Sequence, residues 1–353
     1  MTTLIEHTVR AAQIVSGLAL NPVLTSSALA FLAYGPPRLV DQLVDSGIFK
    51  RYVGLYGLKV ALKVFLGFGV ARHLNRLLNI RASNNWRFSG QDGWVWDKEI
   101  AVITGGCNGI GKATVLGLVK KGVKVAILDI ADLPPDLAQL DTVFYWKCDI
   151  TSSDAVKEAA NSIREHPDLG HPSILINNAG VTMKYKAFIR DAEPEDISKI
   201  FKVNILSHWY TVKEFLPNMV DNNKGHIVTI ASMASHVSMS SAVGYSSSKA
   251  AALSFHEGLA SEIKNIYKAP GVITTIAHPM FVNTDMIRSK RGTTGKGRNI
   301  LEPEEVADAI TGQVFSCRGA QLFMPANTWW ISATRGFPSW LQEAMRDAVA
   351  KMR

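Results

Sequence analysis

The chain has 353 residues, 47% of them hydrophobic, which exceeds one typical domain and suffices for a sizeable buried core. Its formal charge of +8 would suit nucleic acid, a membrane surface or an anionic substrate. The whole excess of positive charge lies between Ser46 and Gln91, a segment without acidic residues. Its basic residues alternate with Leu, Val, Phe and Gly. They are Lys50, Arg51, Lys59, Lys63, Arg72, Arg76, Arg81 and Arg87. This pattern favours a membrane surface over nucleic acid.

The chain has three cysteines, Cys107, Cys148 and Cys317. Their number and spacing indicate neither a disulfide framework nor a zinc site, so we expect the protein in a reducing compartment.

Two apolar stretches near the N-terminus predict membrane association. Residues 11–37 carry no charge, and about 20 helical residues cross a hydrocarbon core of roughly 30 Å, so this run is long enough to span. Residues 53–71 contain Lys59 and Lys63, whose stems can snorkel from a helix lying on the membrane. If the first run spans, the basic block after it places the remainder in the cytoplasm. A cleaved signal peptide and a buried helical subdomain are the alternative interpretations.

A glycine-rich stretch follows the first β-prone run. Residues 99–104 form that run, residues 105–111 read Gly-Gly-Cys-Asn-Gly-Ile-Gly, and an amphipathic stretch continues to Lys121. Strand, glycine turn and helix in this order are the context of a dinucleotide-binding site. Gly105 permits the tight turn, Gly109 lets the backbone approach a pyrophosphate, and Gly111 allows helix and strand to pack closely. The N–H groups at the start of the helix would face the phosphates.

Two acidic residues follow the next two predicted strands. Asp129 ends the strand 124–128, 18 positions beyond Gly111, where a carboxylate can bind the adenosine ribose hydroxyls and repel a 2′-phosphate. This predicts NAD as the cofactor, with NADP as the alternative. Asp149 follows the strand 143–147 and has two interpretations: it caps the adenine amino group, or it is the N-cap of a helix that starts near Ser153.

Five motifs occur in the order and spacing of the short-chain dehydrogenase/reductase family, which the chain resembles from Glu99 to Met324: 104–111, 177–180 (Asn-Asn-Ala-Gly), Asn204, Ser232 and 245–249 (Tyr-Ser-Ser-Ser-Lys). The resemblance implies an α/β fold, a Rossmann-type doubly wound parallel sheet, here with an N-terminal membrane-associated helical extension. It also implies four catalytic residues, namely Asn204, Ser232, Tyr245 and Lys249. The dinucleotide would contact Gly105, Asn108, Gly109, Ile110, Gly111, Asp129, Asp149, Asn178, Tyr245, Lys249, Val282 and Thr284, and no metal site is expected. Residues 278–284 match the family's Pro-Gly-x-x-x-Thr except that Met280 replaces the glycine.

The catalytic roles follow from the chemistry of these side chains. Tyr245 and Lys249, four residues apart, share one face of a helix. The Lys249 ammonium and the nicotinamide cation are expected to lower the phenol pKa from about 10, which makes Tyr245 the general acid/base. Ser232, after the strand 226–231, would bond the substrate oxygen, and Asn204 would hold a water that links Lys249 to solvent. Lys249 would also bind the nicotinamide ribose.

Two later segments have several interpretations. Residues 281–300 correspond to a mobile substrate lid in relatives, and its basic residues would contact anionic headgroups or an acidic substrate, or face solvent: Arg288, Lys290, Arg291, Lys296 and Arg298. The C-terminal aromatic stretch is typical of a membrane-interface belt, a lipophilic pocket wall or ordinary core packing: Trp329, Trp330, Phe337, Trp340 and Leu341.

The sequence therefore predicts an oxidoreductase that transfers hydride between NAD, or NADP, and an alcohol or ketone on a steroid, retinoid or fatty substrate. It resembles the membrane- or lipid-droplet-associated branch that includes retinol and hydroxysteroid dehydrogenases. The expected divisions are an anchor and linker (1–97), a catalytic domain (98–325) and a helical extension (326–353). A homodimer is expected, on the endoplasmic reticulum or lipid droplets, with the catalytic domain facing the cytoplasm. The alternatives are an NADPH-dependent biosynthetic ketoreductase and a non-catalytic dinucleotide-binding membrane scaffold.

Overall fold

The computed structural model describes residues 17–45, 54–183, 188–240, 242–286 and 300–351. The chain divides into two compact units, residues 1–82 and 83–353. Residues 83–97 thus group with the second unit, although the sequence analysis assigned them to the N-terminal region. Most of the expected lid, residues 287–299 with all five of its basic side chains, lies outside the described residues.

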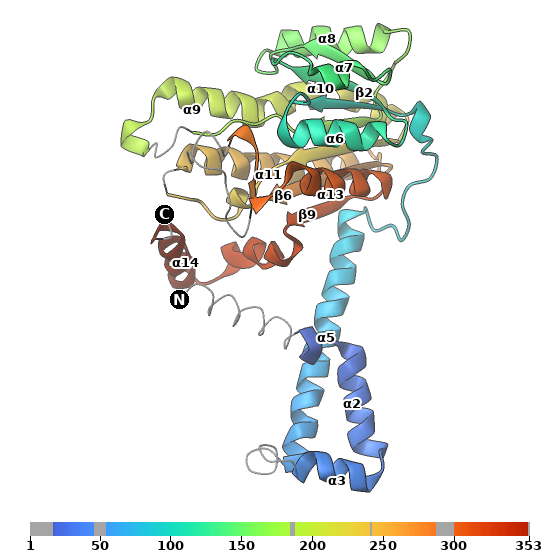
Figure 1. Cartoon of the computed structure of the whole chain (residues 1–353), viewed down its shortest axis with the longest axis vertical. Coiled ribbons are helices and arrows are strands. Elements are labelled where there is room, and N and C mark those ends of the chain that lie inside the picture. The colour runs from blue at the N-terminus through green and yellow to red at the C-terminus, as the bar shows by residue number, and fades with distance from the viewer. Residues whose placement is uncertain (1–16, 46–53, 184–187, 241, 287–299, 352–353) are drawn as a thin grey trace. The chain divides into compact units, whose positions relative to one another are not determined.

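The second unit is built on a seven-stranded parallel sheet, as the sequence predicted (Figure 1). The strand order is β3-β2-β1-β4-β5-β6-β9, so the order of the strands reverses between β1 and β4. In open α/β sheets, ligands bind outside the carboxyl ends of the strands at this switch point. The strands are β1 Ile100–Thr104, β2 Lys124–Asp129, β3 Val143–Lys147, β4 Ile174–Asn177, β5 Gly225–Ile230, β6 Val272–Pro279 and β9 Ala320–Met324.

Helices cover both faces of this sheet, which explains why its central strands β1, β4 and β5 are buried at every position. Along β1, Ala101 and Ile103 belong to the core under α6 (Gly109–Val119) and α13 (Pro303–Phe315), whereas Val102 belongs to the opposite core. That opposite core is covered by α8 Ser153–Glu165, α10 Ser207–Asp221 and α11 Val243–Asn265. The smaller elements are η1 Trp96–Lys98, α7 Pro135–Ala138, η2 Ile189–Asp191, α9 Pro194–Phe201, the π-helical turn η3 Lys202–Leu206, η4 Met233–Ser235, β7 Phe281–Val282, β8 Ile300–Leu301, η5 Ala326–Gly336 and α14 Ser339–Lys351.

The segment that leads into β1 is fixed to the second unit by side-chain hydrogen bonds. Asn84 is 2% exposed, and its amide bonds the carbonyls of Arg87 and Ser89 and the N–H of Gly319. Asn85 Nδ2 donates to the carbonyl of Pro270. Because these bonds reach residues far along the chain, the segment is an ordered part of the catalytic unit.

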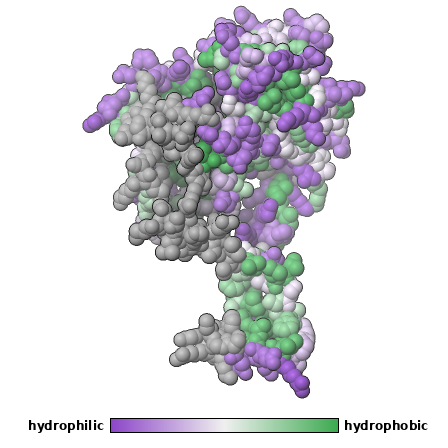
Figure 2. All heavy atoms as spheres, viewed as in Figure 1, coloured by the Kyte–Doolittle hydropathy of each residue, from purple (hydrophilic) through white to green (hydrophobic). Residues whose placement is uncertain are grey.

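The N-terminal unit contains α2 (Pro22–Tyr34), α3 (Pro37–Asp45) and α5 (Gly54–Ser83). The Asn21 side chain accepts bonds from the N–H groups of Val23 and Leu24 and starts α2, whose 13 residues span only about 20 Å. Among the described residues, α5 is instead the helix long and apolar enough to cross a membrane. The second apolar stretch, expected to lie on the membrane, thus forms a helix that could span by its length and composition, whereas residues 11–16 of the first stretch lie outside the described residues. Figure 2 shows hydrophobic side chains over much of the surface of this unit.

The C-terminal tryptophans are not core residues. Trp329 and Trp330 in η5 are 49% and 45% exposed, and Trp340 in α14 is 72% exposed. The core-packing interpretation of these three side chains is therefore wrong. The interface-belt and pocket-wall interpretations remain predictions.

Candidate active site

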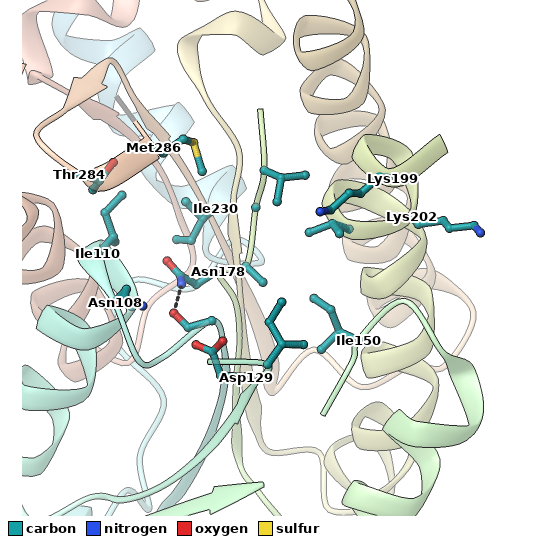
Figure 3. Close-up of a pocket in the computed structure, with 18 of the residues that line it drawn as sticks. Asn108, Ile110, Asp129, Ile150, Asn178, Lys199, Lys202, Ile230, Thr284 and Met286 are labelled. Carbon is teal, nitrogen blue, oxygen red and sulfur yellow. Dashed lines mark hydrogen bonds between the residues drawn. The ribbon is translucent and has the colours of Figure 1, made fainter. Parts of the chain in front are cut away.

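A cavity of about 930 Å³ lies at the switch point, along the carboxyl ends of the strands (Figure 3). Its walls come from the turn after β1, from the ends of β2, β3, β4, β5 and β6, and from α11. The cavity brings together every residue that the sequence analysis assigned to the dinucleotide: Gly105, Asn108, Gly109, Ile110, Gly111, Asp129, Asp149, Asn178, Tyr245, Lys249, Val282 and Thr284.

The glycine turn after β1 forms a backbone cradle that larger residues would fill. Gly105 and Gly109 have φ angles of +68° and +53°, in the left-handed region that favours glycine. A Cβ atom at Gly111 would lie 2.0 Å from the Gly105 carbonyl oxygen. Asn178 Nδ2 donates to the carbonyls of Thr104 and Gly105, so this side chain braces the turn (Figure 3). The cradle, with α6 beginning inside it, fits a pyrophosphate.

Two carboxylates line the part of the cavity expected to hold the adenosine. Asp129 Oδ2 accepts a bond from the N–H of Cys107, and Oδ1 accepts one from Ala131. Burial, aided by the Asp129 charge, raises the pKa of the Cys107 thiol to about 12, so the thiol is neutral. Asp149 Oδ1 accepts bonds from the N–H and hydroxyl of Thr151.

Asp149 is not the N-cap of the following helix. The N-cap of α8 is Ser152, whose hydroxyl accepts a bond from the N–H of Ala155. Serine is as good a cap as aspartate, and it stands one position before the helix. The capping interpretation of Asp149 is therefore wrong, and its place on the cavity wall leaves the adenine interpretation as a prediction.

Tyr245 and Lys249 project from α11 at the cavity. Lys249 is 3% exposed, its Nζ donates to the Ile230 carbonyl at 2.7 Å, and Nζ lies 5.9 Å from the centroid of the Tyr245 ring. Burial lowers the pKa of Lys249 to about 8. Burial also raises the pKa of Tyr245, while a hydrogen bond with the Ser232 hydroxyl acts in the opposite direction. The sequence analysis expected Lys249 and the nicotinamide cation together to lower the pKa of Tyr245. In the protein without cofactor this pKa is raised, because the cost of burying a phenolate dominates.

The other two predicted catalytic residues, Ser232 and Asn204, are buried and do not themselves line the cavity. The Ser232 hydroxyl accepts a bond from the N–H of Ala234 and caps η4. Asn204, fully buried in η3, bonds both the N–H and the carbonyl of Val181, and its Nδ2 also donates to the Ser248 hydroxyl. Both amide hydrogens are thereby used, so only Oδ1 is left to accept a bond from the water predicted there.

Three further residues support this arrangement and were missed as individual site residues. The Thr104 hydroxyl accepts bonds from the N–H groups of Asn178 and Ala179. The Ser248 hydroxyl joins Asn204 to the carbonyl of Tyr245. A Cβ at Gly180 would lie 3.5 Å from Lys249 Nζ and 3.6 Å from Asn204 Oδ1, so glycine keeps that space open. All three residues lie inside the recognised motifs 104–111, 177–180 and 245–249, but the motifs do not reveal these bonds.

We predict that Gly111→Ala abolishes dinucleotide binding, because the added methyl group would collide with the Gly105 carbonyl in the cradle. Titration with NADH, followed by its fluorescence, measures the dissociation constant. Gly312→Ala in α13 is the matched control, because nothing lies within 4 Å of a Cβ there. Equal affinities of the two variants would contradict the cradle.

The comparisons with known proteins agree with this geometry. Residues 99–295 match the family model of the short chain dehydrogenases. Dehydrogenase RED2 of Cochliobolus heterostrophus is 41% identical over 191 residues, which cover 54% of this chain and 70% of that protein. Human estradiol 17-beta-dehydrogenase 11 is 35% identical over 65% of this chain and 75% of its own length. Human 17-beta-hydroxysteroid dehydrogenase 13 is 31% identical, with the same coverage of both chains.

Solved structures share the fold. An alcohol dehydrogenase from Thermococcus sibiricus, complexed with 5-hydroxy-NADP, is 26% identical with a TM-score of 0.55 over 64% of this chain and 95% of that one. A short chain dehydrogenase from Burkholderia cenocepacia in complex with NADP has a TM-score of 0.59 at 22% identity, over 72% of this chain and 99% of that one. The family match, the cradle and the Tyr245–Lys249 pair lead to one conclusion. The chain belongs to the short-chain dehydrogenase family and is an alcohol oxidoreductase.

Proposed function

We propose that this enzyme interconverts an alcohol and a ketone on a lipophilic, steroid-type substrate at a membrane or lipid-droplet surface. The observation that carries the chemistry is the placement of Tyr245 and Lys249 on the wall of the cavity that contains the glycine cradle. The names of the relatives, which include estradiol and hydroxysteroid dehydrogenases, support the substrate class.

The side chains of the site divide the reaction between them. The bound nicotinamide accepts or supplies the hydride. In alcohol oxidation the Tyr245 phenolate takes the hydroxyl proton, and in ketone reduction the Tyr245 phenol returns it. The Ser232 hydroxyl, whose hydrogen bond acts on the Tyr245 phenol, would also bond the reacting oxygen. Lys249 carries a buried positive charge that stabilises the phenolate while it forms. Burial raises the pKa of Tyr245, which opposes alcohol oxidation. The positive charge of the oxidised cofactor would lower this pKa again.

The cofactor preference rests on Asp129. Its carboxylate lies on the cavity wall and is held in place by the N–H groups of Cys107 and Ala131. A fixed negative charge there would repel the 2′-phosphate of NADP and accept bonds from the ribose hydroxyls of NAD. We therefore propose NAD as the preferred cofactor.

The substrate side of the cavity carries apolar side chains next to the charged Asp196 and Lys199. Val181, Met280 and Met286 line the main cavity, and Val181 and Met286 also line an adjoining cavity of about 390 Å³ with Met183 and Ile200. Methionine side chains adapt to irregular apolar surfaces. These walls support a bulky hydrophobic substrate, and the expected polar lid lies outside the described residues.

The proposed location rests on α5. Its most apolar 18-residue window is only 6% buried, and it exposes Phe65 and Phe68 by 42% and 65%. Burying such surface in lipid is favourable by about 25 cal/mol per Å². We propose attachment to the endoplasmic reticulum or to lipid droplets, with the catalytic unit facing the cytoplasm.

The proposed homodimer rests on exposed apolar side chains beside the long helices. Leu206 and Trp209 are 40% and 59% exposed, next to Asn204 and at the start of α10. Trp209 packs edge-on against Phe255 of α11, so the two helices present one surface. A monomeric mass in mild detergent would exclude this dimer.

We predict that the purified protein, incubated with a membrane lipid extract and NAD, converts specific alcohols to ketones that mass spectrometry detects. Tyr245→Phe is the blank, because it removes the proton acceptor and retains the ring. A parallel incubation with NADPH tests the ketoreductase alternative. Absence of turnover with either cofactor across sterols, retinoids and fatty alcohols would favour a dinucleotide-binding scaffold.

We predict that ketone reduction loses rate as the pH rises through about 8. The pKa of Tyr245 is raised, so the phenol stays protonated there, whereas the Lys249 ammonium, with a pKa of about 8, loses its proton. The pH profile of kcat measures this limb. Lys249→Arg keeps the charge, so it should be slower but move the limb to higher pH. An unmoved limb would exclude Lys249 as its origin.

We predict that replacing Phe65 and Phe68 with Asp releases the protein from lipid vesicles. Each charge at the centre of a membrane helix costs about 2.5–3.5 kcal/mol, so the bound fraction should fall sharply. Flotation with vesicles of phosphatidylcholine and phosphatidylserine measures it. Replacing Ile189 and Ile266 of the catalytic unit, which are 73% and 70% exposed, with Asp is the control. Equal loss in both variants would contradict anchoring by α5.

A further inference from the structure

The C-terminal segment, which lies beyond the region matched to the family model, contacts the turn behind the catalytic serine. Arg335, near the end of η5, donates from Nη2 to the Ser235 carbonyl at 2.8 Å and from Nε to the His236 carbonyl at 3.2 Å. These carbonyls stand at the end of η4, the turn that Ser232 caps. One guanidinium group thus binds two successive carbonyls. Its planar array of donors suits this geometry better than the single ammonium group of a lysine would.

The turn that Arg335 contacts is joined to both Ser232 and the helix of Lys249. The Ser235 N–H donates to the Ser232 carbonyl at 3.0 Å, and the Ser235 hydroxyl donates to the Lys249 carbonyl at 2.9 Å. Ser235 is fully buried, so these bonds are shielded from water. A displacement of this turn would therefore reach Ser232 and Lys249 together.

A buried histidine holds the same turn from the side of the sheet. Burial lowers the pKa of His278 to about 4, so its ring is neutral. Gln321 donates to Nε2 of this ring at 3.1 Å, which leaves the Nδ1 proton to donate to the Ser232 carbonyl at 3.2 Å. The turn is thus held by β6 on one side and by Arg335 on the other.

Further contacts keep Arg335 in place. The Thr328 hydroxyl lies 3.8 Å from Met233 Sδ, so η5 contacts η4 at a second point. Gln342 of α14 donates to the carbonyls of Arg335 and Phe337. The arginine is therefore part of an ordered segment.

We propose that Arg335 is a positioning residue for the active site, which fixes Ser232 and Lys249 by clamping the turn 233–236. The C-terminal segment then completes the catalytic site. Among the described residues, Arg335 is the side chain that donates hydrogen bonds to the Ser235 and His236 carbonyls. This inference deepens the proposed function and rests on it. Since the Ser232 hydroxyl opposes the raised pKa of Tyr245, loosening the turn also shifts the ionisation of the phenol.

Arg335→Met, compared with Arg346→Met, tests the clamp. Arg346 lies in the same segment but bonds Gln342 and Glu343 of its own helix. In oxidation of a steroid secondary alcohol with NAD, Arg335→Met should lower kcat about tenfold or more, with the NADH dissociation constant unchanged, because misplacing catalytic groups by a fraction of an ångström slows the chemistry. Its pH profile should move up by about half a unit, since the phenol ionises later. Arg335→Lys should recover part of kcat.

Ser235→Ala keeps the proposal testable if Arg335→Met does not fold, because it cuts the bond from the turn to Lys249 without removing the arginine. It should reproduce the pH shift, and the double variant should be no slower than the slower single one. Equal kcat values and pH profiles for Arg335→Met and Arg346→Met would overturn the proposal, as would loss of NADH binding in step with kcat. No turnover by the unmodified enzyme would instead overturn the proposed function.

Discussion

The active site depends on a buried positive charge. Lys249 is 3% exposed, and the Ile230 carbonyl is the partner that its ammonium bonds. Burial opposes ionisation of this group and of the Tyr245 phenol beside it, so the protein alone holds the lysine near its titration point and the tyrosine protonated. Proton transfer can then be controlled by what enters the cavity, since the charge of the oxidised nicotinamide adds to that of Lys249.

The parallel sheet is what brings this charge to the cofactor. Because all its strands run in one direction, the glycine turn after β1, Asp129 after β2 and the Ile230 carbonyl at the end of β5 meet at one edge of the sheet. Asn204 then joins the Val181 backbone to Ser248 on α11, and η4 joins Ser232 to the same helix. Hydrogen bonds therefore join the residues proposed as catalytic to α11 and to the ends of β4 and β5.

The sequence predicted the structure well where a residue type has a single structural role, such as glycine in a tight turn or an apolar run in a buried strand. The glycines at 105, 109 and 111 and the apolar runs predicted the cradle and the sheet, and every residue assigned to the cofactor lines the cavity. The failures concern burial and hydrogen-bond partners. Burial decides that the pKa of Tyr245 is raised. Ser152, not Asp149, caps α8, and Asn204 bonds Val181 and Ser248. The spacing of residues in the sequence reveals none of these features. In the N-terminal unit, apolar composition predicted the two stretches but did not show that α2, after Asn21, would have only 13 residues.

The most direct test of the central claim is titration of the Tyr245 phenol itself. The difference in phenolate absorbance between the wild type and Tyr245→Phe, recorded against pH with and without saturating NAD⁺, isolates this one group. A phenol that is buried beside Lys249 should ionise above the ordinary value of about 10 in the free protein and at a clearly lower pH when NAD⁺ is bound. Identical titrations in the two states would contradict control of the proton by the cofactor charge. An ordinary pKa in the free protein would contradict the burial on which that control rests.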